Sequence, residues 1–230
     1  MSRFVSFAFV LVFCSVTFAA DAPKGIAVDK EKRTITIDAK IAPRKLEDPK
    51  FKGNQWPIEA IATWSYEKKG QKAHETVVTV DDIKPSDVAK AIESLGLKPG
   101  KPAYGEDSIK TPPEGPAFNV YIEISGDDGP KRVPIEKCLI HQTSGKPMPK
   151  VEWRFTGSIM TKPDPDKDEM VYGADLTGTL ITIFPVTNET VFQTSLTMKE
   201  EKYLKLETDP KVVPKVGTAV KLVLEVVDKK

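Results

Sequence analysis

The sequence is poor in the residues that most often carry chemistry. It has two cysteines and two histidines in 230 residues. Cys14 lies in an apolar N-terminal stretch, so Cys138 is the thiol that remains if this stretch is removed, and one thiol cannot form an internal disulfide. An iron–sulfur cluster, which needs about four thiolates, is excluded for the same reason. The hydrophobic core must therefore stabilise the fold.

An excess of charge of either sign is also lacking. There are 34 Lys and Arg against 33 Asp and Glu, and loss of Arg3 with the N-terminal stretch would leave 33 of each. A balanced surface gives no electrostatic reason to expect nucleic acid or an anionic membrane as a partner. No glycine-rich phosphate loop and no second long apolar run occurs. We expect no nucleic-acid partner, no cofactor and no transmembrane anchor.

The first 20 residues have the pattern of a secretory signal peptide. Arg3 precedes the apolar run Phe4–Phe13, and small residues favour cleavage after Ala19 or Ala20. Phe13 stands where a lipoprotein signal requires a small residue before Cys14, which argues against a lipid anchor. We expect export to the periplasm or the extracellular space. The mature chain is expected to comprise an N-terminal hairpin and irregular segment (21–57) packed on a domain formed by 58–230.

One stretch predicts a helix near 85–95. Pro85 suits a first helical position, and Val88, Ala91, Ile92 and Leu95 share one face. Gly96 is placed to end the helix in a left-handed conformation, and two prolines follow.

The remainder of the chain predicts short strands. Alternating or β-branched segments are expected as strands, and Glu67–Lys72 as a charged turn that pairs Ile58–Tyr66 with His74–Val80 in a hairpin. The other predicted strands are Ile26–Val28, Thr34–Ile37, Ala117–Ser125, Lys131–Ile135, Val151–Met160 with a bulge at Gly157, Gly178–Phe184, Thr190–Thr197 and Thr218–Val227. Gly100–Pro116 is expected as a surface loop and Lys199–Leu206 as a short helix. The fold class is α+β, mainly β, with twisted antiparallel sheets and one principal helix. Whether the sheets pack as two layers is left undecided.

Four segments together resemble the YdjY-domain family, exported bacterial proteins of undetermined function. They are His74–Val77, Leu95–Gly100, Trp153–Ser158, and Tyr172–Leu176 leading into Gly178–Ile181. The resemblance extends from about Ile58 to the C-terminus. It implies no settled activity. Some relatives carry a ferredoxin-like label, which the lone Cys138 contradicts.

Candidate metal ligands are few. His74, Glu75, His141 and Cys138 would form a site only if the fold brought them together, because their spacing follows no metal motif. Asp164, Asp166 and Asp168, with Asp175 further on, alternate as in hard-cation loops, but Glu169 occupies the position that needs glycine. The alternatives, two unrelated histidines and a solvated acidic turn, are favoured, and we expect no metal.

Other sites are equally weak on sequence alone. Ser158 follows Gly157 inside a predicted strand, so a nucleophile elbow is not favoured. Cys138 lies in an apolar run and is expected to be buried. Trp56, Trp64 and Trp153, with Tyr66 and Phe155, form either an aromatic binding face or part of the core, and the core is the favoured alternative.

These observations favour an exported, soluble, non-catalytic module that binds a protein or another component of the cell envelope. The candidate binding residues are His74, Glu75, Trp153 and Asp175, and no catalytic residue is assigned. The alternative is a metal-dependent enzyme or accessory protein that uses His74, Glu75 and Asp175. A structural envelope component that self-associates is the third hypothesis, since the sequence leaves the oligomeric state open.

Overall fold

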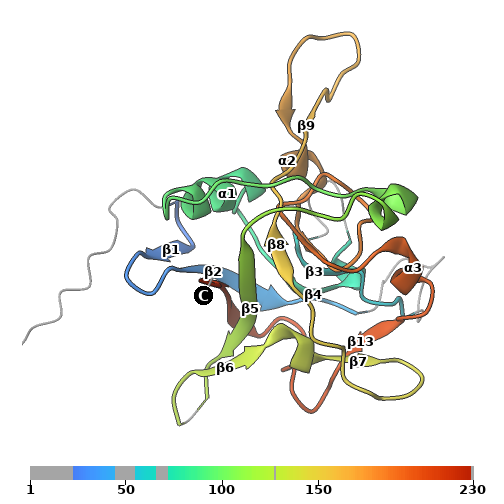
Figure 1. Cartoon of the computed structure of the whole chain (residues 1–230). Helices are drawn as coiled ribbons and strands as arrows, with labels where there is room; N and C mark the ends of the chain where they lie inside the picture. Colours follow the sequence, from blue (N-terminus) through green and yellow to red (C-terminus); the bar gives the residue numbers. More distant parts are fainter. Residues whose placement is uncertain (1–22, 45–54, 66–71, 127, 229–230) are drawn as a thin grey trace, which may run out of the picture.

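The computed structural model describes residues 23–44, 55–65, 72–126 and 128–228. Within this part of the chain, eight strands form a closed barrel with helices and loops across one end (Figure 1). In order around the barrel, the strands are β2 (Thr34–Ile41), β14 (Ala219–Val226), β5 (Ala117–Ile124), β8 (Trp153–Phe155), β12 (Phe192–Thr194), β11 (Thr179–Thr182), β3 (Ala60–Thr63) and β4 (Thr76–Thr79). β1 (Ile26–Asp29) pairs with β2, and β6 (Lys131–Pro134) pairs with β5.

The mainly β, α+β class is confirmed, but open twisted sheets are the wrong arrangement. The barrel closes because the end of β2 pairs with β4, Lys40 opposite Thr79 and Ile41 opposite Val78. Closure leaves no free edge in the eight-stranded ring. Alternation in the sequence shows which side chains face the core, but not whether a sheet closes on itself.

The predicted hairpin of Ile58–Tyr66 with His74–Val80 is also wrong. β3 and β4 are neighbours but run parallel, with Ala60 opposite Thr76. A parallel pair needs a crossover of about a dozen residues, and the segment between the two strands, which includes the short 3-10 helix η1 (Ala73–Glu75), is long enough. β11 and β12 are parallel as well. Tyr66 and residues 67–71 of the expected turn lie outside the described residues, as does the expected signal peptide.

The long strands match their sequence patterns. The hairpin of β1 and β2 is confirmed, and β5 and β14 pair antiparallel along most of their length. Their alternate apolar residues are buried, as expected from the period of two. Aromatic rings fill the interior, where Phe192 packs edge-on against Phe118 with centroids 5.1 Å apart and lies 5.6 Å from Phe155.

The principal helix is confirmed as α1 (Pro85–Glu93), which lies over one end of the barrel (Figure 1). Pro85 is at its start, and Val88, Ala91 and Ile92 are buried against the core. Gly96 follows with φ +80°, the left-handed conformation expected of a helix-terminating glycine.

Two further α-helices occur in the described chain. α2 (Gly173–Thr177) was not expected, whereas α3 (Met198–Glu201) confirms a short helix near the predicted position. Thr197 and Glu200 form a capping box at the start of α3. The chain then extends into β13 (Leu206–Thr208), which pairs with β7 (Leu139–His141) in a small separate sheet.

The loop 100–116 is more ordered than a plain surface loop. It contains the 3-10 helix η2 (Gly105–Ile109), and the buried Gln193 side chain fixes it to the barrel. Gln193 Oε1 accepts from Ala103 N (2.7 Å) and its Nε2 donates to Ala103 O (2.9 Å).

The predicted strand Val151–Met160 is interrupted after β8. Gly157 has φ +66°, and a Cβ there would lie 2.6 Å from the Cβ of Pro99, so this glycine breaks the strand rather than forming a bulge within it. Beyond it, β9 (Met160–Thr161) and β10 (Val171–Tyr172) form a hairpin that projects away from the barrel (Figure 1). We call residues 159–172 the arm. No helix among the described residues is long and apolar enough to cross a membrane.

Candidate functional site

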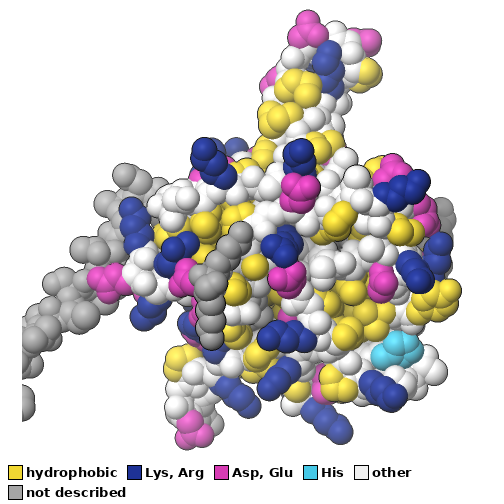
Figure 2. Space-filling view, viewed as in Figure 1, with side chains coloured by type: hydrophobic (Ala, Val, Ile, Leu, Met, Phe, Trp, Pro, Cys, Tyr) yellow, Lys and Arg dark blue, Asp and Glu magenta, His cyan; other side chains and the backbone are white. Residues whose placement is uncertain are grey.

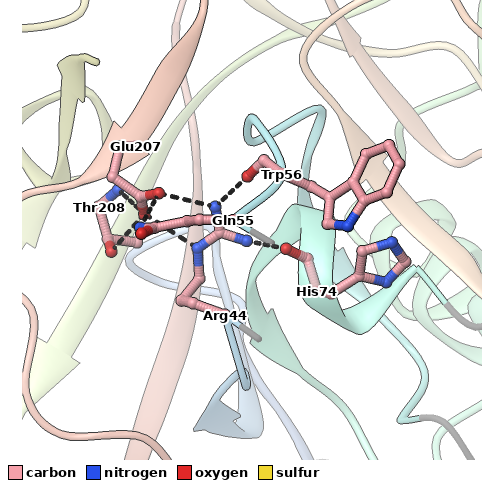
Figure 3. Close-up of polar contacts among 6 residues, drawn as sticks. All are labelled: Arg44, Gln55, Trp56, His74, Glu207 and Thr208. Carbon is pink, nitrogen blue, oxygen red and sulfur yellow. Dashed lines mark hydrogen bonds and ion pairs between the residues drawn. The ribbon is translucent and has the colours of Figure 1, made fainter. Parts of the chain in front are cut away.

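Two groups of charged side chains in the described chain lie in contrasting surroundings outside the apolar core. The first, the polar cluster, is centred on Arg44 and Glu207 (Figure 3). Arg44 Nε lies 2.9 Å from Glu207 Oε1 and its second guanidinium nitrogen 3.0 Å from Oε2, a bidentate ion pair. Arg44 also donates to the carbonyls of His74 and Trp56. The side chains of Arg44 and Glu207 are only 11% and 14% exposed.

Glu207 is held in its charged form. Burial alone would raise the pKa of its carboxyl, but the hydrogen bonds and charge of Arg44, with bonds from Thr208 N (2.7 Å) and Oγ1 (2.9 Å), lower the pKa below the usual value. Gln55 donates to the same carboxylate. The cluster therefore ties the segment before β3, η1 and β13 together.

Two of the predicted binding residues lie beside this cluster. His74 Nε2 is 3.3 Å from Glu75 Oε1, and Lys72 Nζ lies 2.9 Å from Glu75 Oε2 and 3.2 Å from Glu59 Oε2. Burial lowers the pKa of His74, and the neighbouring Lys72 and Arg44 charges act in the same direction, against Glu75. The imidazole is therefore favoured in its neutral form.

The other candidate metal ligands lie elsewhere. His141 Nδ1 accepts from Thr143 N and Ser144 N (3.2 and 3.3 Å), and its Nε2 lies 3.1 Å from Tyr203 O. Cys138 is buried, as expected, and burial raises its pKa to about 12. In the part of the chain that is described, no three His, Cys, Asp or Glu side chains are grouped so that they could hold a metal ion.

The acidic residues of the expected cation loop are dispersed along the arm. Asp164 pairs with Lys167 (3.1 Å) and Asp168 with Lys162 (3.0 Å), while Asp164 Oδ1 accepts from Asp166 N (3.1 Å). These are the contacts of a solvated turn, the favoured alternative.

Asp175 connects two helices. Its Oδ1 accepts a hydrogen bond from Ser86 N (2.8 Å), so α2 provides a carboxylate cap for the first turn of α1. Asp175 therefore has a structural contact, at a different location from the Arg44–Glu207 cluster.

Trp153 lies in the barrel wall and is 1% exposed. Its Nε1 donates to Glu136 Oε1 (2.8 Å). Phe155 is fully buried too, which fits the core interpretation for these two residues, whereas Trp56 and Trp64 are partly exposed. Ser158 Oγ accepts from Ala174 N (2.9 Å) at the base of the arm.

The second charged group surrounds an open cavity of about 700 Å³, which we call the groove. Its volume is in the range of ligand sites. β5 forms one wall, and η3 (Ile135–Cys138), β7 and the segments 147–150 and 209–212 form the others. The apolar surface comes from Val120, Pro134, Ile140, Pro147, Met148 and Val212.

The charged side chains that line the groove differ in their hydrogen bonds and ion pairs. Glu136 is bonded to Trp153, and Asp209 Oδ1 accepts from Lys211 N (2.9 Å). Lys137 and Lys150 are exposed, and neither forms an ion pair or side-chain hydrogen bond within the described chain. The groove therefore offers an apolar floor beside two available ammonium groups.

Tyr121 adds a phenol at the β5 wall. Burial raises the pKa of Tyr121, as does the charge of Glu225, whose Oε1 lies 3.4 Å from the hydroxyl. Arg132 lies over the same ring, 5.8 Å from its centroid.

Sequence reasoning missed the groove because its walls come from segments far apart in the chain. One local pattern could have indicated it: in Lys146-Pro147-Met148-Pro149-Lys150, lysines flank an apolar segment that two prolines keep from forming a helix.

The fold and the groove together define a mainly β barrel protein with an open cavity on its outer surface. The chain belongs to the YdjY family, because the YdjY domain model matches residues 26–225. The match includes β1 and β2, which the sequence placed before the family-like part. No curated protein and no solved structure matches the chain.

Proposed function

We propose that this protein is an exported, non-catalytic module that binds an extended segment of a protein partner in the cell envelope, and that the groove is the binding site. The observation that carries the proposal is the combination of an apolar floor with two exposed lysines at its rim, unpaired within the described chain. Peptide-binding sites commonly use apolar surface for affinity and a few charged groups for orientation.

The charge state of the rim supports a segment with acidic residues. The two carboxylates that line the groove already accept hydrogen bonds from Trp153 and from Lys211 N. Both carboxylates are half-buried and keep their charge, whereas Lys137 and Lys150 are exposed, so the lysines are the charges that a partner meets first. An acidic, partly apolar peptide would contact both the lysines and the apolar floor.

The alternative, a metal-dependent enzyme using His74, Glu75 and Asp175, has less support. Asp175 bonds Ser86 at the start of α1, whereas His74 and Glu75 contact each other next to Lys72. Stoichiometric metal in protein purified without chelator would favour that alternative over the proposal.

A site-specific photo-crosslinker tests the groove. Placed at Lys137 or Lys150 in the native host, it should give a discrete protein adduct. The matched controls are Lys30 and Lys110, which are exposed, form no ion pair with a described residue and lie outside the groove. Adducts at the controls but not at the groove, or none at any of the four positions, would contradict the proposal.

A further inference from the structure

The arm carries apolar side chains that no described part of the chain covers. Met160 and Met170 are 52% and 47% exposed, and Ile159 is exposed beside them. Hydrophobic side chains are visible along the projection, with charged groups toward its tip (Figure 2). Methionine adapts its shape to an opposing surface and is enriched in protein interfaces.

Hydrogen bonds join the two sides of the arm at its base and connect the arm to the segment before β12, where Ile159 N donates to Asn188 O (3.3 Å). Ser158 N donates to the Tyr172 hydroxyl (2.9 Å), Gly173 N donates to Ile159 O (2.9 Å), and Thr161 Oγ1 donates to Glu189 Oε1 (2.6 Å). Burial raises the pKa of Tyr172 to about 12, consistent with a phenol enclosed at this junction. A fixed base means that little ordering is required before the arm contacts a partner.

Some charged side chains of the arm form ion pairs within the arm, and others do not. Lys162 and Lys167 pair with Asp168 and Asp164. Asp166 and Glu169 are exposed, and their carboxylates form no ion pair with any described residue. The arm therefore presents two available carboxylates beside its apolar side chains.

The groove has the complementary properties. The groove has an apolar floor and the ammonium groups of Lys137 and Lys150. The arm has apolar side chains and the carboxylates of Asp166 and Glu169. The arm projects from one end of the barrel, whereas η3, β6 and β7 lie at the other (Figure 1). Lys and Arg side chains surround that second end (Figure 2). The arm of one molecule can therefore approach the groove of another without blocking its own.

We propose that the arm of one copy of this chain occupies the groove of a second copy, so that molecules associate head to tail. This inference rests on the proposed function, because it names the partner of the groove. A head-to-tail contact joins different surfaces, so it continues beyond a dimer unless it closes into a ring. An anionic lipid surface is a poorer occupant for the arm, because its available carboxylates would be repelled.

Charge reversal on each surface tests the contact. Sedimentation velocity of the purified protein from about 1 to 500 µM should show a weight-average mass that rises with concentration and falls with added salt. Asp166→Lys with Glu169→Lys places ammonium groups on the arm, which would then face Lys137 and Lys150 of the groove. Lys137→Glu with Lys150→Glu gives an acidic groove facing an acidic arm. Each double variant alone should associate at least about tenfold more weakly.

Mixing the two variants is the decisive measurement. The basic arm of the first variant meets the acidic groove of the second, and the unchanged arm of the second meets the unchanged groove of the first, with Lys137 and Lys150 in place. Association should therefore return in the mixture to within about threefold of wild type. The control, Lys30→Glu with Lys110→Glu, reverses two exposed lysines that are unpaired within the described chain and should associate like wild type. Circular dichroism should show all variants folded.

Three results would overturn the head-to-tail contact: a wild-type protein that stays monomeric across the range, association that neither reversal weakens, or a mixture that stays as weak as its components. If the photo-crosslinker in the groove then captures a different protein, only this inference fails. If it captures nothing, the proposed function fails as well.

Discussion

The polar cluster and the groove both contain lysine or arginine beside carboxylates, yet their charges are used differently. In the cluster, Arg44 and Glu207 bond to each other and to neighbouring carbonyls and hydroxyls, and both side chains are nearly buried. In the groove, Lys137 and Lys150 are exposed and bond to no described side chain.

The comparison teaches which charges stabilise the fold and which are available to a partner. Charges removed from water must be paired, because an unpaired buried charge is costly. Exposed charges incur no such cost and contribute little to stability even when paired. We therefore expect substitutions in the cluster to act on folding and substitutions at the groove rim to act on binding.

The largest effect is expected from Arg44→Ala. The variant leaves the nearly buried Glu207 carboxylate without its ion pair and two carbonyls without a donor, so the free energy of unfolding should fall by about 2–4 kcal/mol. Urea denaturation followed by circular dichroism measures the loss.

The double variant Arg44→Met with Glu207→Leu is the matched control. It removes both charges together, so it should recover a large part of the stability that Arg44→Ala loses. An Arg44→Ala variant as stable as wild type would show that the cluster does not hold the fold.

A smaller effect is expected from pH. Because the pKa of Glu207 is lowered in the folded protein, the unfolded chain binds more protons at low pH. The stabilisation by this carboxylate is fully present above the ordinary value of 4.5 and is lost as pH falls through the lowered folded value.

Comparison with Glu207→Gln isolates this contribution, since Glu200 and Asp29 also have lowered pKa values. The difference in unfolding free energy between wild type and variant should be constant above pH 4.5 and shrink below it. A difference that does not change at low pH would mean that the charge of Glu207 does not contribute to stability.

Local parts of the fold could be predicted from sequence. α1 and the hairpin of β1 and β2 follow from periodicity and from Pro85 and Gly96, which act within a few residues. Closure of the barrel and the parallel pairing of β3 with β4 depend on which distant segments meet. Every residue of these two short strands is buried, and the pattern of apolar residues does not show in which direction a strand runs beside its neighbour.

Side-chain partners were harder to predict than elements. Leu95 continues the apolar face of α1 in sequence but is only partly buried, because the helix ends before it. Asp175 resembles a ligand in sequence, but its partner is Ser86, a residue far away in the chain. The groove has no single motif, since β5, η3 and two later segments form it.

The smallest effect on stability is expected from Lys137→Ala with Lys150→Ala. Both side chains are exposed and unpaired within the described chain, so the free energy of unfolding should change by no more than about 0.5 kcal/mol. The same urea titration used for Arg44→Ala measures it. A loss above about 1 kcal/mol would mean that these lysines stabilise the fold. The polar cluster and the groove lysines would then both stabilise the fold. The exposure of Lys137 and Lys150 would no longer support a role in binding a partner.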